Sequence, residues 1–368
     1  MGTKAKILAR GIVAARPGQM YAWPGIARLK NGEILVSASE RTSHICPLGR
    51  EVVIRSLDGG RSWQLPQEVY NSELDDRDSN LAVLPDGTVI LTWFTSDAFT
   101  LRDYAQPKFQ PRIDRVTKRM RAELCGSWLL RSFDGGHAWE DTPRPIPAGC
   151  HAGPTVLSDG AMIYLGVVKS GDSHEMSALV SRDAGISWEK KSEIATPKRT
   201  WKDEKGHHLP IIDENHVLEL SPGRLLALFR ADGPGEGFLY QSNSEDGGAS
   251  WSPIKKLPVA GLPPHLLRLH SGAIFCSYAH RRNPWSVRAV LSYDDGRSWD
   301  VENIITLDAW DDKPDMGYPV SLEVTPGEIV TVYYCARKTR KWVADEEKLD
   351  KKGSTPEGLL YTRLLIEG

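Results

Sequence analysis

Cysteine is scarce in this chain of 368 residues, and no two cysteines have the Cys-x-x-Cys spacing. The five are Cys46, Cys125, Cys150, Cys276 and Cys335. An odd number without that spacing argues against a disulfide framework and against a zinc site. We therefore expect free thiols in a reducing compartment and a cytoplasmic protein, or a periplasmic or secreted one if a signal segment has been removed.

Long apolar runs and a strong net charge are also lacking. The first 18 residues, MGTKAKILARGIVAARPG, hold no continuous apolar stretch like that of a secretory signal, and no later run is as long as a membrane span. The formal net charge is −2 and the pI is about 6.6, so the overall field favours neither nucleic acid nor a membrane surface. We expect no partner of either kind, and a smaller ligand instead.

The chain does contain a repeated pattern, S-x-D-x-G-x-x-W, which begins at Ser56, Ser132, Ser181, Ser244 and Ser292. Its aspartates are 76, 49, 63 and 48 residues apart, a spacing typical of radial or stacked repeats. In such a turn the serine and aspartate can bind backbone amides and the glycine can take a positive φ. The tryptophan can then fold back to fill a gap between strands. Because the pattern recurs five times, we interpret it as structural rather than catalytic.

Six segments with apolar, β-branched and aromatic residues on both sides of a glycine predict β-hairpins. The glycines are Gly32, Gly87, Gly160, Gly223, Gly272 and Gly327. One strand before each tryptophan turn and one after it complete a four-stranded unit, and no segment has the pattern of an amphipathic helix. The sequence thus predicts an all-β protein: one domain over residues 1–368, folded as a six-bladed propeller of antiparallel blades. We expect KILARGIVA near the N-terminus and GLLYTRLLI near the C-terminus to complete the last blade together.

The hairpin glycines and the tryptophan turns should lie on one face of the ring, which leaves the second face for function. We expect on that face the residues just before each first strand and just after each second strand. They are Tyr21, Ala22, Trp23, Glu40, Arg41, His44, Arg77, Asp78, His151, Asp213, Glu214, His216, Arg230, His265, His280, Arg281, Arg282, Arg288, Asp315 and Tyr318. Converging arginines, histidines, carboxylates and aromatics are typical of a pocket for a polar, anionic, sugar-sized ligand. For any one of them alone, a solvated loop residue is the commoner explanation.

Residues 97–124 form an insertion over the same face. It contains seven lysines and arginines and four aspartates and glutamates. Two interpretations stay open for it: a basic lid that retains an anionic substrate, and a charged insertion or oligomer contact, which would make the protein a homo-oligomer.

Five such turns on a propeller resemble the sialidase superfamily, in which they are called Asp-boxes or BNR repeats. Members of that family hold the sugar carboxylate with three arginines, use a tyrosine nucleophile helped by a glutamate, and use an aspartate as acid/base. The resemblance implies Glu214 in DENHVLEL and Arg230 at the end of LLALFR. It also implies Arg288 in NPWSVRAVLSYDDGRSW and Tyr318 in MGYPVSLEVTPGEIVTVYY, and ASER ending at Arg41 is similar to a sialidase segment.

The chain also departs from that family. YAWP places Ala22 where the first arginine belongs, followed by the bulky Trp23. TSHICPLGRE, where the acid/base aspartate is expected, has none, so His44 is the obvious proton carrier there. The histidines at 151, 216 and 265 are further candidates for proton chemistry or substrate binding, and no local spacing favours a metal.

Three functions follow. The first is a sialidase-like, exo-acting glycoside hydrolase with altered specificity for an acidic or otherwise polar sugar, working through Tyr318, Glu214 and His44 without cofactor or metal. Its substrate-binding candidates are Arg230, Arg288, Arg41, Arg77, Asp78, His151, His216, His265, Arg281 and Trp23. The second is a lyase on uronate-containing glycans, with a tyrosine and a histidine abstracting the proton α to a carboxylate. The third is a carbohydrate-binding propeller without catalysis.

Overall fold

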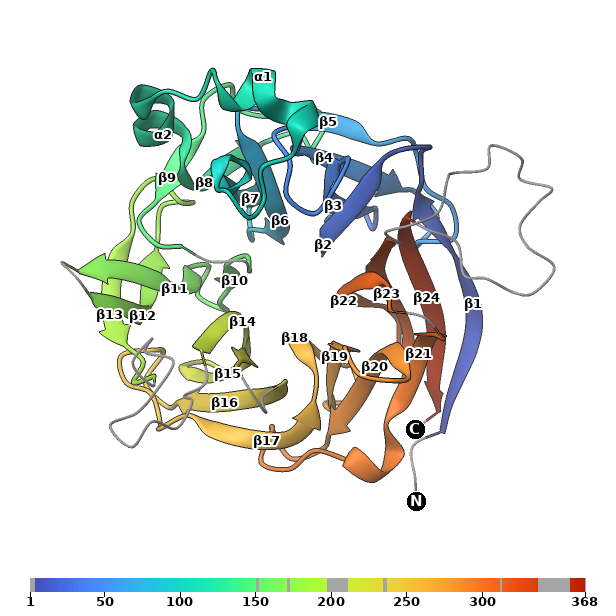
Figure 1. Ribbon diagram of the computed structural model, residues 1–368. Helices are drawn as coiled ribbons and strands as arrows, with labels where there is room; N and C mark the ends of the chain where they lie inside the picture. The colour runs from blue at the N-terminus through green and yellow to red at the C-terminus, as the bar shows by residue number, and fades with distance from the viewer. Residues whose placement is uncertain are drawn as a thin grey trace.

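The computed structural model describes residues 4–149, 152–170, 173–196, 211–233, 237–311, 313–336 and 358–367. Its strands form six four-stranded antiparallel sheets around a central axis (Figure 1). The predicted all-β, six-bladed propeller is confirmed. None of the helices in the described segments is long and apolar enough to cross a membrane.

We number the blades in chain order and give their strands from the axis outward. Blade 1 consists of β2 (Met20–Arg28), β3 (Ile34–Arg41), β4 (Arg50–Ser56) and β5 (Gln67–Tyr70). Blade 2 consists of β6 (Asp75–Val83), β7 (Val89–Ser96), β8 (Gly126–Ser132) and β9 (Arg144–Ile146). Blade 3 consists of β10 (Thr155–Val156), β11 (Met162–Ser170), β12 (Ser173–Ser181) and β13 (Glu189–Glu193).

The second half of the ring repeats this order. Blade 4 consists of β14 (Ile211–Ser221), β15 (Arg224–Asp232), β16 (Phe238–Ser244) and β17 (Lys255–Ala260). Blade 5 consists of β18 (Leu262–Arg268), β19 (Ile274–His280), β20 (Trp285–Ser292) and β21 (Ile305–Trp310). Blade 6 consists of β22 (Asp315–Thr325), β23 (Glu328–Ala336), β24 (Gly358–Glu367) and β1 (Lys4–Ala14).

Blade 6 closes the ring with strands from both ends of the chain. β1 pairs with β24 in antiparallel register from Lys4 opposite Glu367 to Ala14 opposite Leu359. In Figure 1 the blue first strand runs beside the red last strand. This arrangement confirms the expected shared blade.

Each Asp-box is a hydrogen-bonded turn. In the first, Ser56 Oγ donates to Asp58 Oδ1 at 2.8 Å and accepts from Gly60 N at 2.8 Å. Asp58 Oδ1 also accepts from the backbone amides of Arg61 and Ser62, each at 2.9 Å. Slight burial raises the pKa of Asp58, but hydrogen bonds from Ser62, Ser56 and Arg61 outweigh it and hold the pKa well below its usual value. The carboxylate is thus occupied in holding the turn.

Two box tryptophans pack against strands of their own blade and also fill gaps between blades. Trp139 of blade 2 packs against Leu35 and Val53 of blade 1. Trp299 of blade 5 packs in a cluster with Leu226 of blade 4, and its Nε1 donates to Gln241 Oε1 of that blade at 3.2 Å. A repeat pattern within one blade cannot reveal this, because the partner side chains lie in another repeat.

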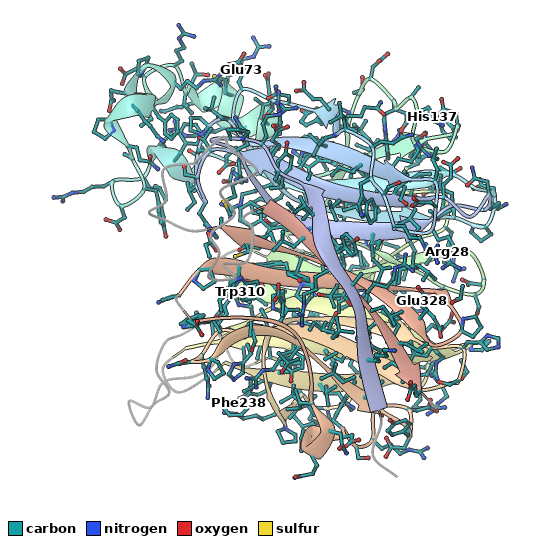
Figure 2. The ribbon with its side chains drawn as sticks, turned by 90° about the vertical axis from the view of Figure 1, so that its right-hand side faces the viewer. Arg28, Glu73, His137, Phe238, Trp310 and Glu328 are labelled. Carbon is teal, nitrogen blue, oxygen red and sulfur yellow. The ribbon has the colours of Figure 1, made fainter. Side chains whose placement is uncertain are left out.

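The two faces of the ring carry different elements. In Figure 2, Arg28, His137 and Glu328 lie toward the side of the hairpins and Asp-boxes, while Trp310 and Phe238 lie toward the other side. The insertion after β7 lies on that second side and forms η1 (Ala98–Thr100), η2 (Pro107–Phe109), α1 (Gln110–Ile113) and α2 (Lys118–Leu124).

The insertion braces the loop that follows β3. Gln106 Nε2 donates to Ser43 Oγ at 3.5 Å, and Arg112 Nη1 donates to the carbonyl of Pro47 at 3.1 Å. Phe99 and Phe109 are buried within it. These contacts fix the loop in which His44 lies.

Candidate active site

Five of the six innermost strands carry a β-bulge. The pairing register shifts in β2, β6, β14, β18 and β22, and in four of them a non-glycine residue adopts a positive φ. The φ angles are 52° at Trp23, 61° at Asp78, 28° at Glu214 and 50° at Tyr318. This backbone conformation is costly for a side-chain-bearing residue and is concentrated at functional sites. The candidates were expected in loops ahead of these strands, but they lie within the strands.

Ala184 and Asp295 are the other described non-glycine residues with positive φ. Both lie in Asp-boxes, at the position where three other boxes have Gly59, Gly135 and Gly247. Their backbone is explained by the turn. The bulge residues have no such explanation, which singles them out as a site.

Tyr318, Glu214 and Arg230 form the centre of this site. Tyr318 Oη donates to Glu214 Oε1 at 2.5 Å. Arg230 Nη1 donates to Glu214 Oε2 at 2.6 Å and to Tyr318 Oη at 3.1 Å. Glu214 is 8% exposed, so the pair is largely shielded from bulk water.

Burial raises the pKa of Tyr318 well above its usual value, and the charge of Glu214 raises it further, while Arg230 opposes the shift. The phenol is therefore protonated at neutral pH and needs a base before it can act as a nucleophile. Glu214, which accepts the hydrogen bond from the phenol, is the carboxylate placed to take that proton.

Arg281 is the second arginine at the phenol. Its guanidinium carbon lies 5.5 Å from the centroid of the Tyr318 ring, and its Nε donates to the carbonyl of Met316 at 3.2 Å. Arg288, which the family pattern implied, lies on β20, where its Nε donates to Ser286 Oγ at 2.8 Å. No contact found in the described residues joins Arg288 to Tyr318, Glu214 or Arg230.

Trp23 occupies the neighbouring bulge and engages two other predicted arginines. The guanidinium carbons of Arg41 and Arg77 lie 4.6 Å and 4.4 Å from its ring centroid. Arg41 is fully buried and forms an ion pair with Asp75, and Arg77 Nη1 lies 3.8 Å from the same carboxylate. These two arginines thus hold Trp23 in place at the side of the site.

His44 belongs to a second polar group beside Trp23. Its Nδ1 lies 2.7 Å from Asp315 Oδ2, and Tyr334 Oη donates to Asp315 Oδ1 at 2.9 Å. Burial opposes ionisation of Asp315, but the hydrogen bond and charge of His44 outweigh it and hold the pKa below its usual value. The His44 ring meets Trp23 edge-on, with centroids 5.1 Å apart.

Two predicted histidines, His216 and His265, lie apart from the group formed by His44 and Asp315. They belong to two innermost strands, β14 and β18. Their ring centroids are 4.3 Å apart. His216 Nδ1 accepts from Leu266 N of the next blade, and His265 Nδ1 accepts from Ser321 N of the blade after that, each at 3.3 Å. The two rings join three successive inner strands through backbone contacts.

This pair predicts a pH-dependent stability. Burial lowers the pKa of His216 to about 4, and burial together with the nearby His216 lowers that of His265. Since unfolded histidine takes up its proton near pH 6.5, the unfolded state binds more protons below that pH, and the contribution of this pair to stability falls from about pH 6.5 toward pH 4. Because both histidine side chains are partly exposed, solvent screening limits the loss to about 1–2 kcal/mol.

Urea unfolding between pH 7 and 4.5 would measure this loss. In His216→Asn/His265→Asn, the amide oxygen replaces Nδ1 as an acceptor without titrating, so the variant should lose less stability than wild type as the pH falls. Burial raises the pKa of Glu51 to about 8 and that of Asp76 to about 6, but these carboxyls titrate alike in both proteins, so the difference between the two slopes reports the histidines. An unchanged slope in the double variant would contradict the assignment.

His151 lies outside the described residues. Asp78 is 2% exposed, with Oδ1 3.8 Å from Arg77 Nε. The sequence did not point to Asp75, Tyr334 or Asp232, whose Oδ1 accepts from Arg230 Nη2 at 3.2 Å. Its position two residues after Arg230 in β15, on the same face, was the available signal for Asp232.

No group of three or more histidine, cysteine, aspartate or glutamate side chains in the described part of the chain is arranged to hold a metal ion. What the site offers is a partly buried phenol bonded to a carboxylate, two arginines, and an imidazole, 47% exposed, that is backed by a second carboxylate. Side chains of these types can carry out acid/base and nucleophilic chemistry.

Comparisons with known proteins agree with the propeller fold. Residues 116–331 match the family described as BNR repeat-like domain, and the chain belongs to that family. No curated protein matches the chain in sequence. Among solved structures, a protein of unknown function from Dyadobacter fermentans is 20% identical, with a TM-score of 0.76 and 99% of each chain covered.

Sialidases share the fold. The NanB sialidase of Streptococcus pneumoniae is 13% identical, with a TM-score of 0.64, and the match covers 98% of this chain and 70% of that one. The intramolecular trans-sialidase of Ruminococcus gnavus is 14% identical, with a TM-score of 0.64 and 94% of each chain covered. The protein is therefore a sialidase-like BNR propeller in architecture.

Proposed function

We propose that the protein is an exo-acting glycoside hydrolase that cleaves an acidic or otherwise polar sugar through a tyrosyl intermediate. The observation that carries this proposal is the 2.5 Å hydrogen bond from Tyr318 Oη to Glu214 Oε1, with Arg230 bound to both. A protonated phenol facing a carboxylate is a nucleophile paired with its base.

The reaction has two steps. Glu214 takes the phenolic proton while Tyr318 Oη attacks the anomeric carbon, and the glycosidic C–O bond breaks as the leaving oxygen receives a proton. Water then attacks the same carbon, the bond to Tyr318 breaks, and Glu214 returns the proton to the phenolate. Two displacements at one carbon retain the anomeric configuration. A tyrosine also avoids the repulsion that a carboxylate nucleophile would meet at an acidic sugar.

Arg230 and Arg281 are the cations nearest the phenol, while Arg41 and Arg77 are held against Trp23 and Asp75. A carboxylate on the sugar would therefore meet two arginines, one fewer than the family clamp. Losing one charge-assisted hydrogen bond costs about 1.5–3 kcal/mol, or roughly ten- to a hundredfold in affinity. We expect sialosides to be poor substrates.

A glycan panel tests the proposal. Sialosides, uronosides, neutral glycosides and uronate-containing polysaccharides are incubated with the same preparation, and reducing sugar, near-ultraviolet absorbance and binding are measured. Hydrolysis releases a reducing sugar without an unsaturated product. An unsaturated product would instead make the protein a lyase, and binding without turnover would make it a carbohydrate-binding propeller. Sialoside cleavage as fast as that of the best panel member would contradict the specificity argument.

A further inference from the structure

The proposed hydrolysis needs a group that protonates the leaving oxygen, and the chain has no aspartate between Arg41 and Glu51 to do so. Four other acidic side chains near the site are unsuited. Glu51 and Asp76 are completely buried, and Asp78 is 2% exposed. Asp232 is bound to Arg230, the cation that also holds the nucleophile pair.

His44 differs from these acidic side chains in its exposure and in the carboxylate that holds its ring. Its side chain is 47% exposed, so one edge of the ring is open to a ligand on the second face. Its Nδ1 is held at 2.7 Å by an ionised carboxylate, Asp315 Oδ2. Because a carboxylate can only accept, Nδ1 carries a proton, and Nε2 is the nitrogen left for chemistry.

The carboxylate of Asp315 is itself held by a hydrogen bond from Tyr334. Tyr334 is completely buried, and its hydroxyl donates to the second oxygen of Asp315 at 2.9 Å. Burial raises the pKa of Tyr334 well above its usual value, so it remains a phenol and keeps donating. The three side chains form one hydrogen-bonded triad, in which Tyr334 and His44 both donate to Asp315.

This triad of Tyr334, Asp315 and His44 lies close to the nucleophile. Asp315 and Tyr318 both lie in β22, three residues apart, and the Tyr318 and Tyr334 rings have centroids 6.1 Å apart. Trp23 contacts both groups, with centroids 5.1 Å from His44 and 6.3 Å from Tyr318. The loop of His44 is fixed by Arg41, whose Nε donates to the carbonyl of Ser43 at 3.2 Å, and by Gln106 of the insertion.

We propose that His44 is the acid/base of the reaction and that Asp315 and Tyr334 are positioning residues that fix its tautomer and orientation. This inference rests on the proposed function. In the first step Nε2 gives its proton to the glycosidic oxygen as the C–O bond breaks, and the leaving group departs as an alcohol. In the second step neutral Nε2 takes a proton from the attacking water, which restores the imidazolium.

Leaving-group dependence tests this role. For the sugar that the panel identifies, wild type and variants are compared on the methyl glycoside, which needs protonation, and on the 4-nitrophenyl glycoside, which departs as a stable anion. His44→Gln should lose about 10²–10⁴-fold in kcat/KM on the methyl glycoside. Its loss on the nitrophenyl glycoside should be smaller by a factor of at least about ten. Asp315→Asn should show the same signature at a smaller size, and Tyr334→Phe a smaller one still.

Azide and a matched control complete the experiment. Azide attacks the intermediate without base catalysis, so it should accelerate His44→Gln on the nitrophenyl glycoside and yield a glycosyl azide. His137→Gln, on the Asp-box face (Figure 2), should behave as wild type on both substrates. Melting temperatures confirm that each variant is folded.

The outcomes separate the two proposals. Equal losses of His44→Gln on both glycosides, or no loss, with Tyr318→Phe inactive, would overturn the assignment of His44 and leave the hydrolase proposal standing. A wild-type protein that hydrolyses no glycoside would overturn both.

Discussion

Tyr318→Phe should lose at least about 10³-fold in kcat while the protein remains folded. The substitution removes the oxygen that attacks the anomeric carbon and keeps the ring that packs against Trp23 and Tyr334. It also removes the hydroxyl contacts of Glu214 and Arg230, but those two remain bonded to each other at 2.6 Å. Loss of the hydroxyl should cost about 1–2 kcal/mol in stability.

Tyr361→Phe is the matched control, because Tyr361 lies on β24 of the same blade, beside Trp63 of the first Asp-box. It should keep wild-type turnover. Initial rates on the best panel substrate and urea unfolding of both variants make the comparison. Turnover by Tyr318→Phe within a few fold of wild type would remove Tyr318 from the mechanism.

Trp299→Ala should lower the free energy of unfolding by about 3–5 kcal/mol, in line with emptying a large buried site. Trp299 is 7% exposed and lies between blades 4 and 5, and its removal also leaves Gln241 Oε1 without this donor. Because Trp299 is in an Asp-box, away from the second face, kcat of the folded fraction should stay within about twofold of wild type.

Trp299→Phe should lose less stability, since the phenyl ring refills part of the gap. Denaturant unfolding and active-fraction kinetics measure the two quantities separately. A Trp299→Ala protein as stable as wild type but inactive would refute the structural interpretation of the Asp-boxes.

The architecture could be predicted because its signals are local. Gly32 and the five other hairpin glycines do have positive φ, from 80° at Gly327 to 101° at Gly87. The Asp-boxes are short motifs in which the serine and aspartate side chains form their hydrogen bonds within the turn. The shared last blade followed from the requirement that a ring has no open edge.

The site could be predicted only in part, because it depends on contacts between blades. The pairing of Tyr318 with Glu214 was implied by a family resemblance, and their hydrogen bond spans 104 residues of sequence. No local pattern distinguishes Arg281 from Arg288 as the arginine beside the phenol, since the choice depends on where β19 ends relative to β22. Arg41 was a binding candidate, yet an ion pair with Asp75 and the Trp23 ring bury it.

The β-bulges explain much of why the site was harder to predict than the architecture. A single extra residue in a strand turns the next side chain toward another face, and the sequence does not mark where that residue falls. Trp23, Asp78, Glu214 and Tyr318 came from four blades with unlike sequences around them. Only the register of the strands reveals that they occupy equivalent positions.

Trapping the covalent intermediate tests the central claim most directly. A substrate analogue with fluorine beside the anomeric carbon and fluoride as the leaving group should react and then hydrolyse slowly, because fluorine destabilises the oxocarbenium-like transition state. Mass spectrometry of the digested protein should find one added sugar, on Tyr318, and none in Tyr318→Phe. A sugar attached to another residue, or turnover of the true substrate with inversion at the anomeric carbon, would contradict a tyrosyl mechanism.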